Sequence, residues 1–337
     1  MRLRVAHERI ALRQPLRTAH GELRERDLFT VELEGSDGIA GRGEAAPLEP
    51  YDGVPAAAIG LALERYARAI AGLTGDPSGS DVFDACRAEA DLPQALAAID
   101  LALWDRRSRH EGSVLAAMLA DEPLTAVTVN ATIGAGDRAG AAAAASAAAA
   151  EGFACVKVKV GVGDDAGRVA AVRAAAGASM AIRLDANGAW SVDEAVRSIQ
   201  ALHAVGLELV EEPVHGIRAL RAVRERTTAR VAMDETCAEP GAIGSGAADA
   251  VCLKVSRCGG ISGTLAAAAL VRASGAEPYL ASTLDGPLGI AAALHYAAAL
   301  RTELPCGLAT LRLLELDDVL PVEHGSIAVP TAPGLLP

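Results

Sequence analysis

Short apolar runs alternate with alanine-rich stretches along the chain from about residue 126 onwards. The runs are rich in Val, Ile and Leu, and most of them end in a polar residue. Successive runs begin roughly 20 to 28 residues apart, a spacing that suits the βα unit of a parallel barrel. The runs lie at 127–130, 155–159, 182–185, 209–211, 231–234, 251–254 and 278–282.

The first third of the chain has a different pattern. Residues 2–44 alternate apolar and polar side chains in short, strand-like runs with glycine-rich turns, and residues 56–117 are predicted to be helical. Residues 1–120 are therefore predicted to form a small α+β domain, and residues 121–318 an α/β barrel. The proline-rich stretch 319–337 is predicted to be extended and to return to the first domain.

A doubly wound parallel sheet is the main alternative fold for this rhythm. Such a sheet normally carries a glycine-rich phosphate loop after an early strand. The segment Gly161-Val162-Gly163 is only a partial match, because no third glycine follows and no acidic residue lies at the distance expected for a ribose contact. The barrel is therefore the preferred prediction.

Composition and charge restrict the class of partner. The 337 residues are 51% hydrophobic but only 3% aromatic, so the core must consist of Ala, Val, Leu and Ile. The net charge of -12, without a basic stripe, argues against nucleic acid as a ligand. An anionic small molecule would need a local cation. The sequence does not decide whether the chain forms a homo-oligomer.

Targeting and redox signals are weak. The six cysteines have no Cys-x-x-Cys spacing and are interpreted as reduced, buried thiols of a cytoplasmic protein. No long apolar stretch follows Met1, so a signal peptide is not expected. The alanine run 139–150 is too short and too weakly apolar to cross a membrane.

Three carboxylates follow successive apolar runs: Asp185, Glu211 and Asp234. One alone could equally cap the next helix. Three at the carboxyl ends of successive barrel strands should instead converge on the catalytic face, where they could hold a hard divalent cation. Glu212 and Glu235 are adjacent acidic residues, and alternation along a strand allows only one of each pair to point at the metal.

Three lysines complete the polar set. Lys157 and Lys159 lie two residues apart among valines and are predicted to share the interior face of one strand, although a solvated lysine pair is the alternative. Neighbouring ammonium groups should lower each other's pKa, as a general base requires. Lys254 precedes a Gly-Gly turn and could reach the same centre from the opposite side.

Together these motifs resemble the enolase superfamily, and specifically its muconate-lactonising branch. The resemblance covers essentially the whole chain, including the segments 15–21 and 43–48. It implies a modified (β/α)8, TIM-like barrel under an α+β capping domain. It also implies an Mg²⁺ cofactor, with Mn²⁺ as a substitute, and a small-molecule carboxylate substrate whose α-proton is removed through an enolate.

The resemblance further implies a role for each polar residue. Lys159 is the acid/base catalyst and Lys157 tunes it, while Lys254 lies on the other side of the substrate. The implied metal ligands are Asp185, Glu211 and Asp234.

The reaction within this branch is left open among three alternatives. The run Cys306-Gly307-Leu308-Ala309-Thr310 lacks the Asp-x-Asp of dipeptide epimerases and resembles o-succinylbenzoate synthases, which catalyse a dehydration in menaquinone biosynthesis. The segments 19–21 and 44–47 look more like epimerases or muconate cycloisomerases. Asp285 could also bind an ammonium group. The preferred prediction is the synthase, with the dipeptide epimerase second.

Two polar segments of the first domain, 17–26 and 44–53, are predicted to be mobile loops that cover the mouth of the barrel. Their side chains are expected near the distal part of the substrate, and residues at the end of the last apolar run are expected to line the wall opposite the lysine pair. The candidate substrate-binding residues are Arg17, His20, Tyr51, Ser282, Thr283 and Asp285.

Overall fold

Seven parallel strands form one curled sheet, in which neighbours in sequence are also neighbours in space. The structure is a computed structural model that describes residues 1–18 and 21–337, with the backbone alone at residues 17, 18 and 21. The strands are β5 (Ala131–Ile133), β6 (Cys155–Lys159), β7 (Ala181–Asp185), β8 (Leu207–Glu211), β9 (Arg230–Met233), β10 (Ala250–Leu253) and β11 (Glu277–Leu280). This arrangement confirms the predicted α/β barrel fold.

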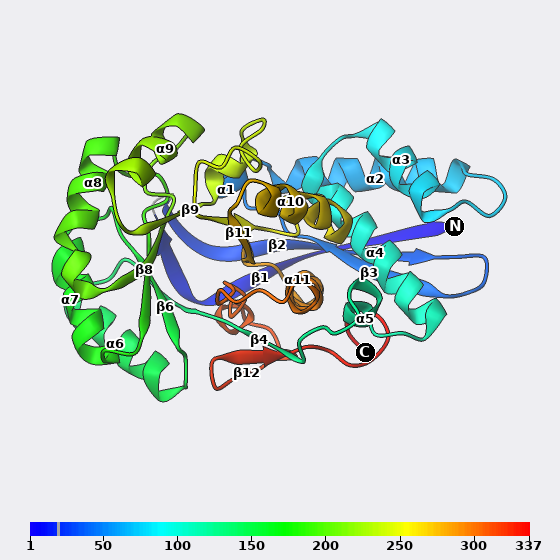
Figure 1. Cartoon of the computed structure of the whole chain (residues 1–337). Helices are drawn as coiled ribbons and strands as arrows, with labels where there is room; N and C mark the ends of the chain where they lie inside the picture. The colour runs from blue at the N-terminus through cyan, green and yellow to red at the C-terminus, as the bar shows by residue number, and fades with distance from the viewer. Residues whose placement is uncertain (19–20) are drawn as a thin grey trace.

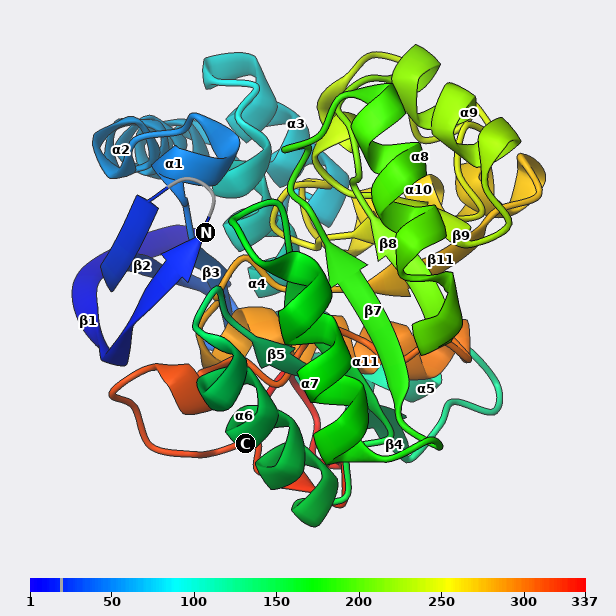
Figure 2. The same ribbon diagram turned by 90° about the vertical axis from the view of Figure 1, so that its left-hand side faces the viewer.

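Helices connect most of the strands and cover their outer face, as α6 to α9 show in Figures 1 and 2. A short 3₁₀ turn, η2 (Glu235–Ala238), lies between β9 and β10. Apolar side chains from the strands and helices form one large core between the two layers. The helices are α6 (Arg138–Ala150), α7 (Asp165–Ala176), α8 (Val192–Ala201), α9 (Ile217–Arg226), α10 (Ile261–Ala273) and α11 (Pro287–Leu300).

The segment 305–307 closes the barrel between the end of β11 and the residues that precede β5. Its Cys306 forms a parallel bridge with Val129, and its Gly307 forms one with Ala281. The first barrel strand differs from the prediction. The first two residues of the apolar run at 127–130 belong to β4 (Ala126–Thr128), which pairs antiparallel with β13 (Ser326–Ala328). Val129 pairs with the closing segment, and the seven-stranded sheet itself begins one step later, at β5.

A three-stranded antiparallel sheet and several helices make up the N-terminal region. The strands are β1 (Arg2–Thr18), β2 (Gly21–Glu34) and β3 (Ala40–Ala45). The helices are α1 (Glu49–Asp52), α2 (Ala56–Gly72), α3 (Gly79–Glu89), α4 (Pro93–Glu111) and α5 (Leu115–Leu119). Apolar side chains of the sheet and of α2 to α4 form a second, separate core.

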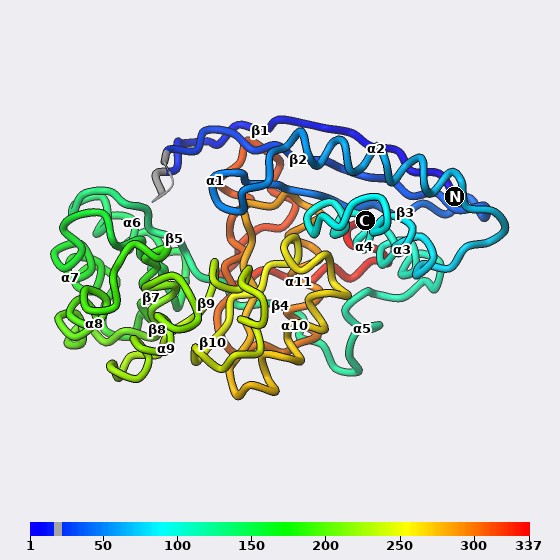
Figure 3. Tube along the Cα trace, turned by 90° about the horizontal axis from the view of Figure 1, so that it is seen from above, coloured from blue at the N-terminus to red at the C-terminus, as the bar shows by residue number. Residues whose placement is uncertain are grey.

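The hairpin of β1 and β2 extends well beyond β3, because β1 and β2 have 17 and 14 residues whereas β3 has 6. Figure 3 shows it running past α1 towards the β5 and α6 side of the barrel. Residues 21–26 lie in β2 and pair with β1, so the prediction of a loop at 17–26 is wrong for that part. Alternating polar residues there form the exposed face of a paired ribbon rather than an unpaired loop.

The last residues of the chain contact the N-terminal region. Leu335 donates its N–H to Asp105 of α4, and Arg109 donates to the carbonyl of Leu336 at 2.7 Å. Arg42 of β3 also donates to the carbonyls of Leu336 and Pro337. Before this point the chain forms β12 (Val322–Glu323) and β13, which extend the sheet that contains β4.

Two further observations concern membrane and redox chemistry. Within the residues that the structure describes, no helix is both long and apolar enough to cross a membrane. The six cysteines are free thiols, and four of them are buried.

Candidate active site

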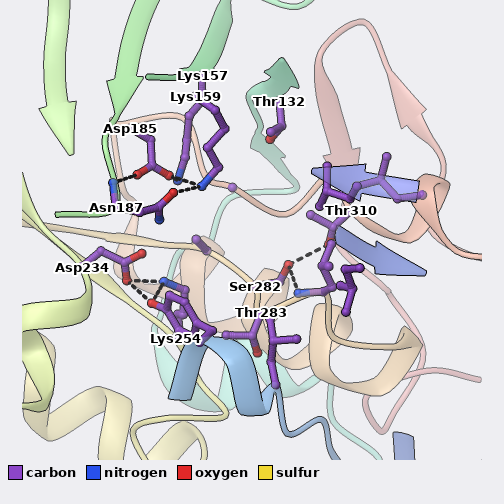
Figure 4. Close-up of a pocket in the computed structure, with 18 of the residues that line it drawn as sticks. Thr132, Lys157, Lys159, Asp185, Asn187, Asp234, Lys254, Ser282, Thr283 and Thr310 are labelled. Carbon is purple, nitrogen blue, oxygen red and sulfur yellow. Dashed lines mark hydrogen bonds and ion pairs between the residues drawn. The ribbon is translucent and has the colours of Figure 1, made fainter. Parts of the chain in front are cut away.

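A cavity of about 160 Å³ opens at the carboxyl ends of the barrel strands, beneath the N-terminal region (Figure 4). Strand ends supply its polar side chains, and the hairpin and α1 supply mostly apolar ones. Its barrel lining is Asn130, Thr132, Lys157, Lys159, Asp185, Asn187, Asp234, Lys254, Ala281, Ser282, Thr283, Leu284, Gly307, Thr310 and Leu313. Its remaining lining is Leu16, Glu22, Leu23, Leu48, Pro50 and Tyr51.

Strand register brings the first polar group together. Lys159, Asp185 and Glu211 are the last residues of β6, β7 and β8, and they are partners across neighbouring strands. Lys159 Nζ lies 2.6 Å from Asp185 Oδ2 and 2.8 Å from Asn187 Oδ1. Lys157 Nζ lies between two carboxylates, 2.8 Å from Asp185 Oδ2 and 2.6 Å from Glu211 Oε1.

Lys254 forms the opposite side of the site, directly after β10. Its ammonium group contacts Asp234 and lies 2.6 Å from the hydroxyl of Tyr51. The Tyr51 hydroxyl in turn donates to Asp234 Oδ1 at 2.7 Å. Arg257 donates to the same hydroxyl and lies over the Tyr51 ring. Tyr51 of α1 therefore joins the N-terminal region directly to the polar centre of the barrel.

For Lys157, the expected lowering of the pKa does not occur. Burial alone would lower the pKa of Lys157, but attraction by Asp185 and Glu211 outweighs burial and raises it well above its usual value. The pKa of Lys254 is raised for the same reason, with Asp234 as the main carboxylate partner. Repulsion between the two lysines was the basis of the expectation, whereas at Lys157 the contacts with Asp185 and Glu211 dominate.

Two of the three predicted carboxylates lie close together, and Lys157 links the third, Asp185, to them. Lys157 bridges Asp185 and Glu211, and oxygen atoms of Glu211 and Asp234 lie within 4.8 Å of each other and of Cys252 Sγ. Burial keeps the pKa of the Cys252 thiol well above its usual value, and a hard cation prefers oxygen. The ammonium groups of Lys157 and Lys254 contact these carboxylates, which shows that the site favours positive charge. Asp185, Glu211 and Asp234 therefore fit a divalent cation such as Mg²⁺.

The two neighbouring acidic residues have other partners. Glu212 is fully buried and accepts hydrogen bonds from the backbone N–H groups of Asp234 and Thr236, at 2.7 and 2.9 Å. It therefore holds the segment after β9 in place. Glu235 accepts from Asn187 at 2.8 Å. Burial, together with repulsion from Asp234, raises the pKa of Glu235 to about 8.

Buried residues below the centre orient Glu211. The hydroxyl of Tyr279 donates to Glu211 Oε2 at 2.7 Å. Arg183, which is fully buried inside the barrel, lies over the Tyr279 ring and pairs with Glu208. The sequence did not reveal the contacts that Tyr279, Asn187 and Glu212 make around the site. Their positions at or beside strand ends were visible, but only the folded barrel shows which side chains meet.

The predicted substrate-binding residues meet different outcomes. Ser282 and Thr283 line the cavity, and Ser282 is hydrogen-bonded to Thr310 at 2.7 Å. Asp285 does not line the cavity and is almost completely buried, accepting from the Thr283 hydroxyl at 2.7 Å. Leu284, the residue between Thr283 and Asp285, has a positive φ of 59°.

His20 lies outside the described residues, and for Arg17 only the backbone, paired with Glu22, is described. Tyr51 lines the cavity, but its hydroxyl contacts Asp234 and Lys254, whereas it had been expected to pack on the distal part of the substrate.

Comparisons with known proteins agree across the chain. Residues 1–120 match the mandelate racemase/muconate lactonizing enzyme N-terminal domain, and residues 140–336 match the enolase C-terminal domain-like family. A hydrophobic dipeptide epimerase of Enterococcus faecalis is 31% identical over 313 residues, which is 89% of this chain and 88% of that protein. An o-succinylbenzoate synthase of Thermobifida fusca is 42% identical, but over 158 residues, 44% of this chain and 48% of that protein.

Solved structures show the same relationship. The Enterococcus faecalis dipeptide epimerase in complex with Mg and L-Leu-L-Tyr matches with a TM-score of 0.91 and 28% identity, covering 99% of this chain and 98% of that chain. The L-Ala-D/L-Glu epimerase of Bacillus subtilis matches with a TM-score of 0.90, 27% identity, and 99% and 97% coverage. The chain therefore belongs to the mandelate racemase/muconate lactonizing enzyme branch of the enolase superfamily and is a metal-dependent lyase or isomerase.

Proposed function

We propose that this enzyme removes the proton α to a substrate carboxylate with Mg²⁺ as cofactor, and that its reaction is the dehydration that yields o-succinylbenzoate. Asp185, Glu211 and Asp234 would hold the cation. When bound, Mg²⁺ supplies positive charge that stabilises the negative charge developing on the carboxylate. The buried position of all three ligands supports this assignment.

The lysines divide the proton chemistry between them. Lys159 would remove the α-proton and then, as an ammonium, protonate the departing hydroxyl on the same face. Lys157, which bridges Asp185 and Glu211, would hold both carboxylates in position and tune Lys159. Lys254 would remain a cation on the opposite face, where its contacts with Asp234 and Tyr51 keep it fixed.

The preference for the dehydration rests on the cavity wall next to the segment 305–307. Residues 304–313 contain no carboxylate, and the wall presents the hydroxyls of Ser282 and Thr310 beside Leu313. The ammonium group of a dipeptide would lose its hydration here without gaining a counter-charge, which is costly. A cyclic dicarboxylate with an apolar ring has no such requirement.

Dipeptide epimerisation is the second candidate, because one carboxylate does reach the cavity from the other side. Glu22 of the hairpin lines the cavity and pairs with Arg24. It could receive a substrate ammonium. Lys159 and Lys254 on opposite faces would then each serve one stereoisomer.

An assay with both substrate classes separates the candidates. The purified protein with Mg²⁺ is given the hydroxylated cyclohexadiene that forms o-succinylbenzoate by losing one water, and aromatic product is followed by absorbance. In parallel, a set of L,L-dipeptides is incubated in D₂O, and α-proton exchange is followed by NMR. We expect product in the first assay and no exchange in the second. Exchange without aromatic product, abolished by Glu22→Gln, would establish the epimerase instead.

A further inference from the structure

Arg26 of β2 is a buried arginine that contacts the backbone of two separate segments. Its guanidinium group, in a side chain only 2% exposed, donates to the carbonyls of Ala46 at 2.9 Å and Pro47 on one side. On the other side it donates to the carbonyls of Thr283 at 3.1 Å and Leu284 at 3.3 Å. One charged group therefore links the N-terminal region to the loop after β11.

Both segments form walls of the cavity. The chain after Pro47 supplies Leu48, Pro50 and Tyr51, and the segment after β11 supplies Ser282, Thr283 and Leu284. Leu284 has a positive φ of 59°, a conformation that persists only where surrounding contacts fix it. The hydrogen bond from Arg26 to the Leu284 carbonyl is one of those contacts.

Two buried carboxylates complete the cluster around Arg26. Glu44 accepts the backbone N–H of Gly286 at 2.6 Å and that of Leu288 at 3.3 Å, at the start of α11. A Cβ atom at Gly286 would lie 2.5 Å from Glu44 Oε2, so a larger residue there would displace the Glu44 side chain. Asp285 lies beside them and attracts the guanidinium. Among the described residues, neither Arg26 nor these two carboxylates line the cavity.

We propose that Arg26 is a positioning residue for substrate binding: it sets the separation between the wall at 48–51 and the wall at 282–284 without touching the substrate. The guanidinium donates to both segments. If one segment moves, the guanidinium must either lose its hydrogen bonds to that segment or move with it and stretch its hydrogen bonds to the other segment. The inference requires only that the cavity binds the substrate, and it holds for either of the two reactions proposed above.

The competing explanation is that Arg26 only stabilises the fold. Arg173 offers a matched control, because it also donates to several carbonyls, including those of Met180 at 2.6 Å and Val205 at 2.9 Å, but at the opposite end of the barrel. Arg173→Met should therefore lower stability without affecting the cavity. If Arg26 were only structural, Arg26→Met would behave in the same way.

The kinetic test compares Arg26→Lys, Arg26→Met and Arg173→Met with the wild-type enzyme, using whichever substrate is active in the assay above. We expect Arg26→Met to raise KM about tenfold or more while kcat changes much less, with Arg26→Lys intermediate because lysine lacks the planar fork. A fourth variant, Arg26→Ala, should also have a raised KM, and millimolar guanidinium should lower it by occupying the space that the side chain leaves. An unchanged KM in the folded Arg26 variants, or an equal rise in Arg173→Met, would overturn the proposal.

A second measurement does not depend on the substrate. Hydrogen–deuterium exchange of Arg26→Met should accelerate at 46–53 and 282–288 together, with β7 unchanged, whereas Arg173→Met should affect only the segments near 177–180 and 203–206. If the wild-type enzyme turns over neither substrate class, the proposed function fails but this measurement still decides the role of Arg26. Faster exchange at only one of the two walls would show that Arg26 does not couple them.

Discussion

Lys159 contacts a carboxylate that we assign to the metal as well as an amide oxygen, and this predicts two separable effects of removing it. Lys159→Met should reduce turnover by roughly 10²–10⁴-fold or more, because no other group on that face takes the proton. The same change should leave Mg²⁺ affinity equal or higher, since the ammonium group lies 2.6 Å from Asp185 and competes with the cation. Calorimetric titration with Mg²⁺ and the turnover assay measure the two effects. Weaker Mg²⁺ binding would contradict this role.

At the level of single residues, the sequence located the strand-end groups but not their partners. Asp185, Glu211 and Asp234 were recognisable because each follows an apolar run. The apolar pattern could not show which of Glu211 and Glu212 faces the metal site, because both side chains are buried in the fold. Only the position of the segment after β9 shows that Glu212 binds its backbone N–H groups.

At the level of elements, close packing between β3 and α4 makes a prediction about stability. A Cβ atom at Gly43 would collide with the carbonyl of Ala98 and the N–H of Ala102. Gly43→Ala should therefore destabilise the protein by about 1–3 kcal/mol or more, because backbone atoms cannot move aside easily. Gly72→Ala is the matched control, with no neighbouring atom within 4 Å. Thermal denaturation measures both, and an equal effect of the two changes would refute the packing argument.

The helices and strands could be predicted where the hydrophobic periodicity is strong. The prediction failed where a strand pairs with a partner that is distant in the sequence. The alternation of apolar runs and alanine-rich stretches indicated the barrel units, because most of the strands after β5 are buried on both faces. Residues 21–26 were predicted as a loop, but their partner strand lies earlier in the chain and the sequence carries no sign of that register. The run at 127–130 was assigned to the barrel, although its main partner, β13, lies about 200 residues later.

For the molecule as a whole, His295 connects α11 to the last residues of the chain. It should also make the folded protein less stable in acid. It is fully buried, its Nε2 lies 3.2 Å from the carbonyl of Leu335, and burial lowers its pKa to about 4. The unfolded chain therefore binds a proton between pH 6.5 and 4 that the folded protein does not. The contribution of His295 should therefore lower the free energy of unfolding as the pH falls through this window, by roughly 3 kcal/mol.

Urea unfolding of the wild-type protein and of His295→Gln at pH 7 and pH 4.5 measures this effect. We expect a smaller acid-induced loss in His295→Gln, whose side chain does not titrate and can still donate to Leu335. Equal losses in the two proteins would assign the acid sensitivity to other groups.

The hydrogen bonds of Arg26 to both walls also have an evolutionary consequence. A substitution at Leu48 that enlarges the cavity shifts a segment whose backbone is tied, through one guanidinium, to the segment that carries Leu284. The effects of changes at the two positions should therefore be epistatic, so that the benefit of one depends on which residue occupies the other. A lineage acquiring a new substrate would be expected to pass through only some orders of mutation.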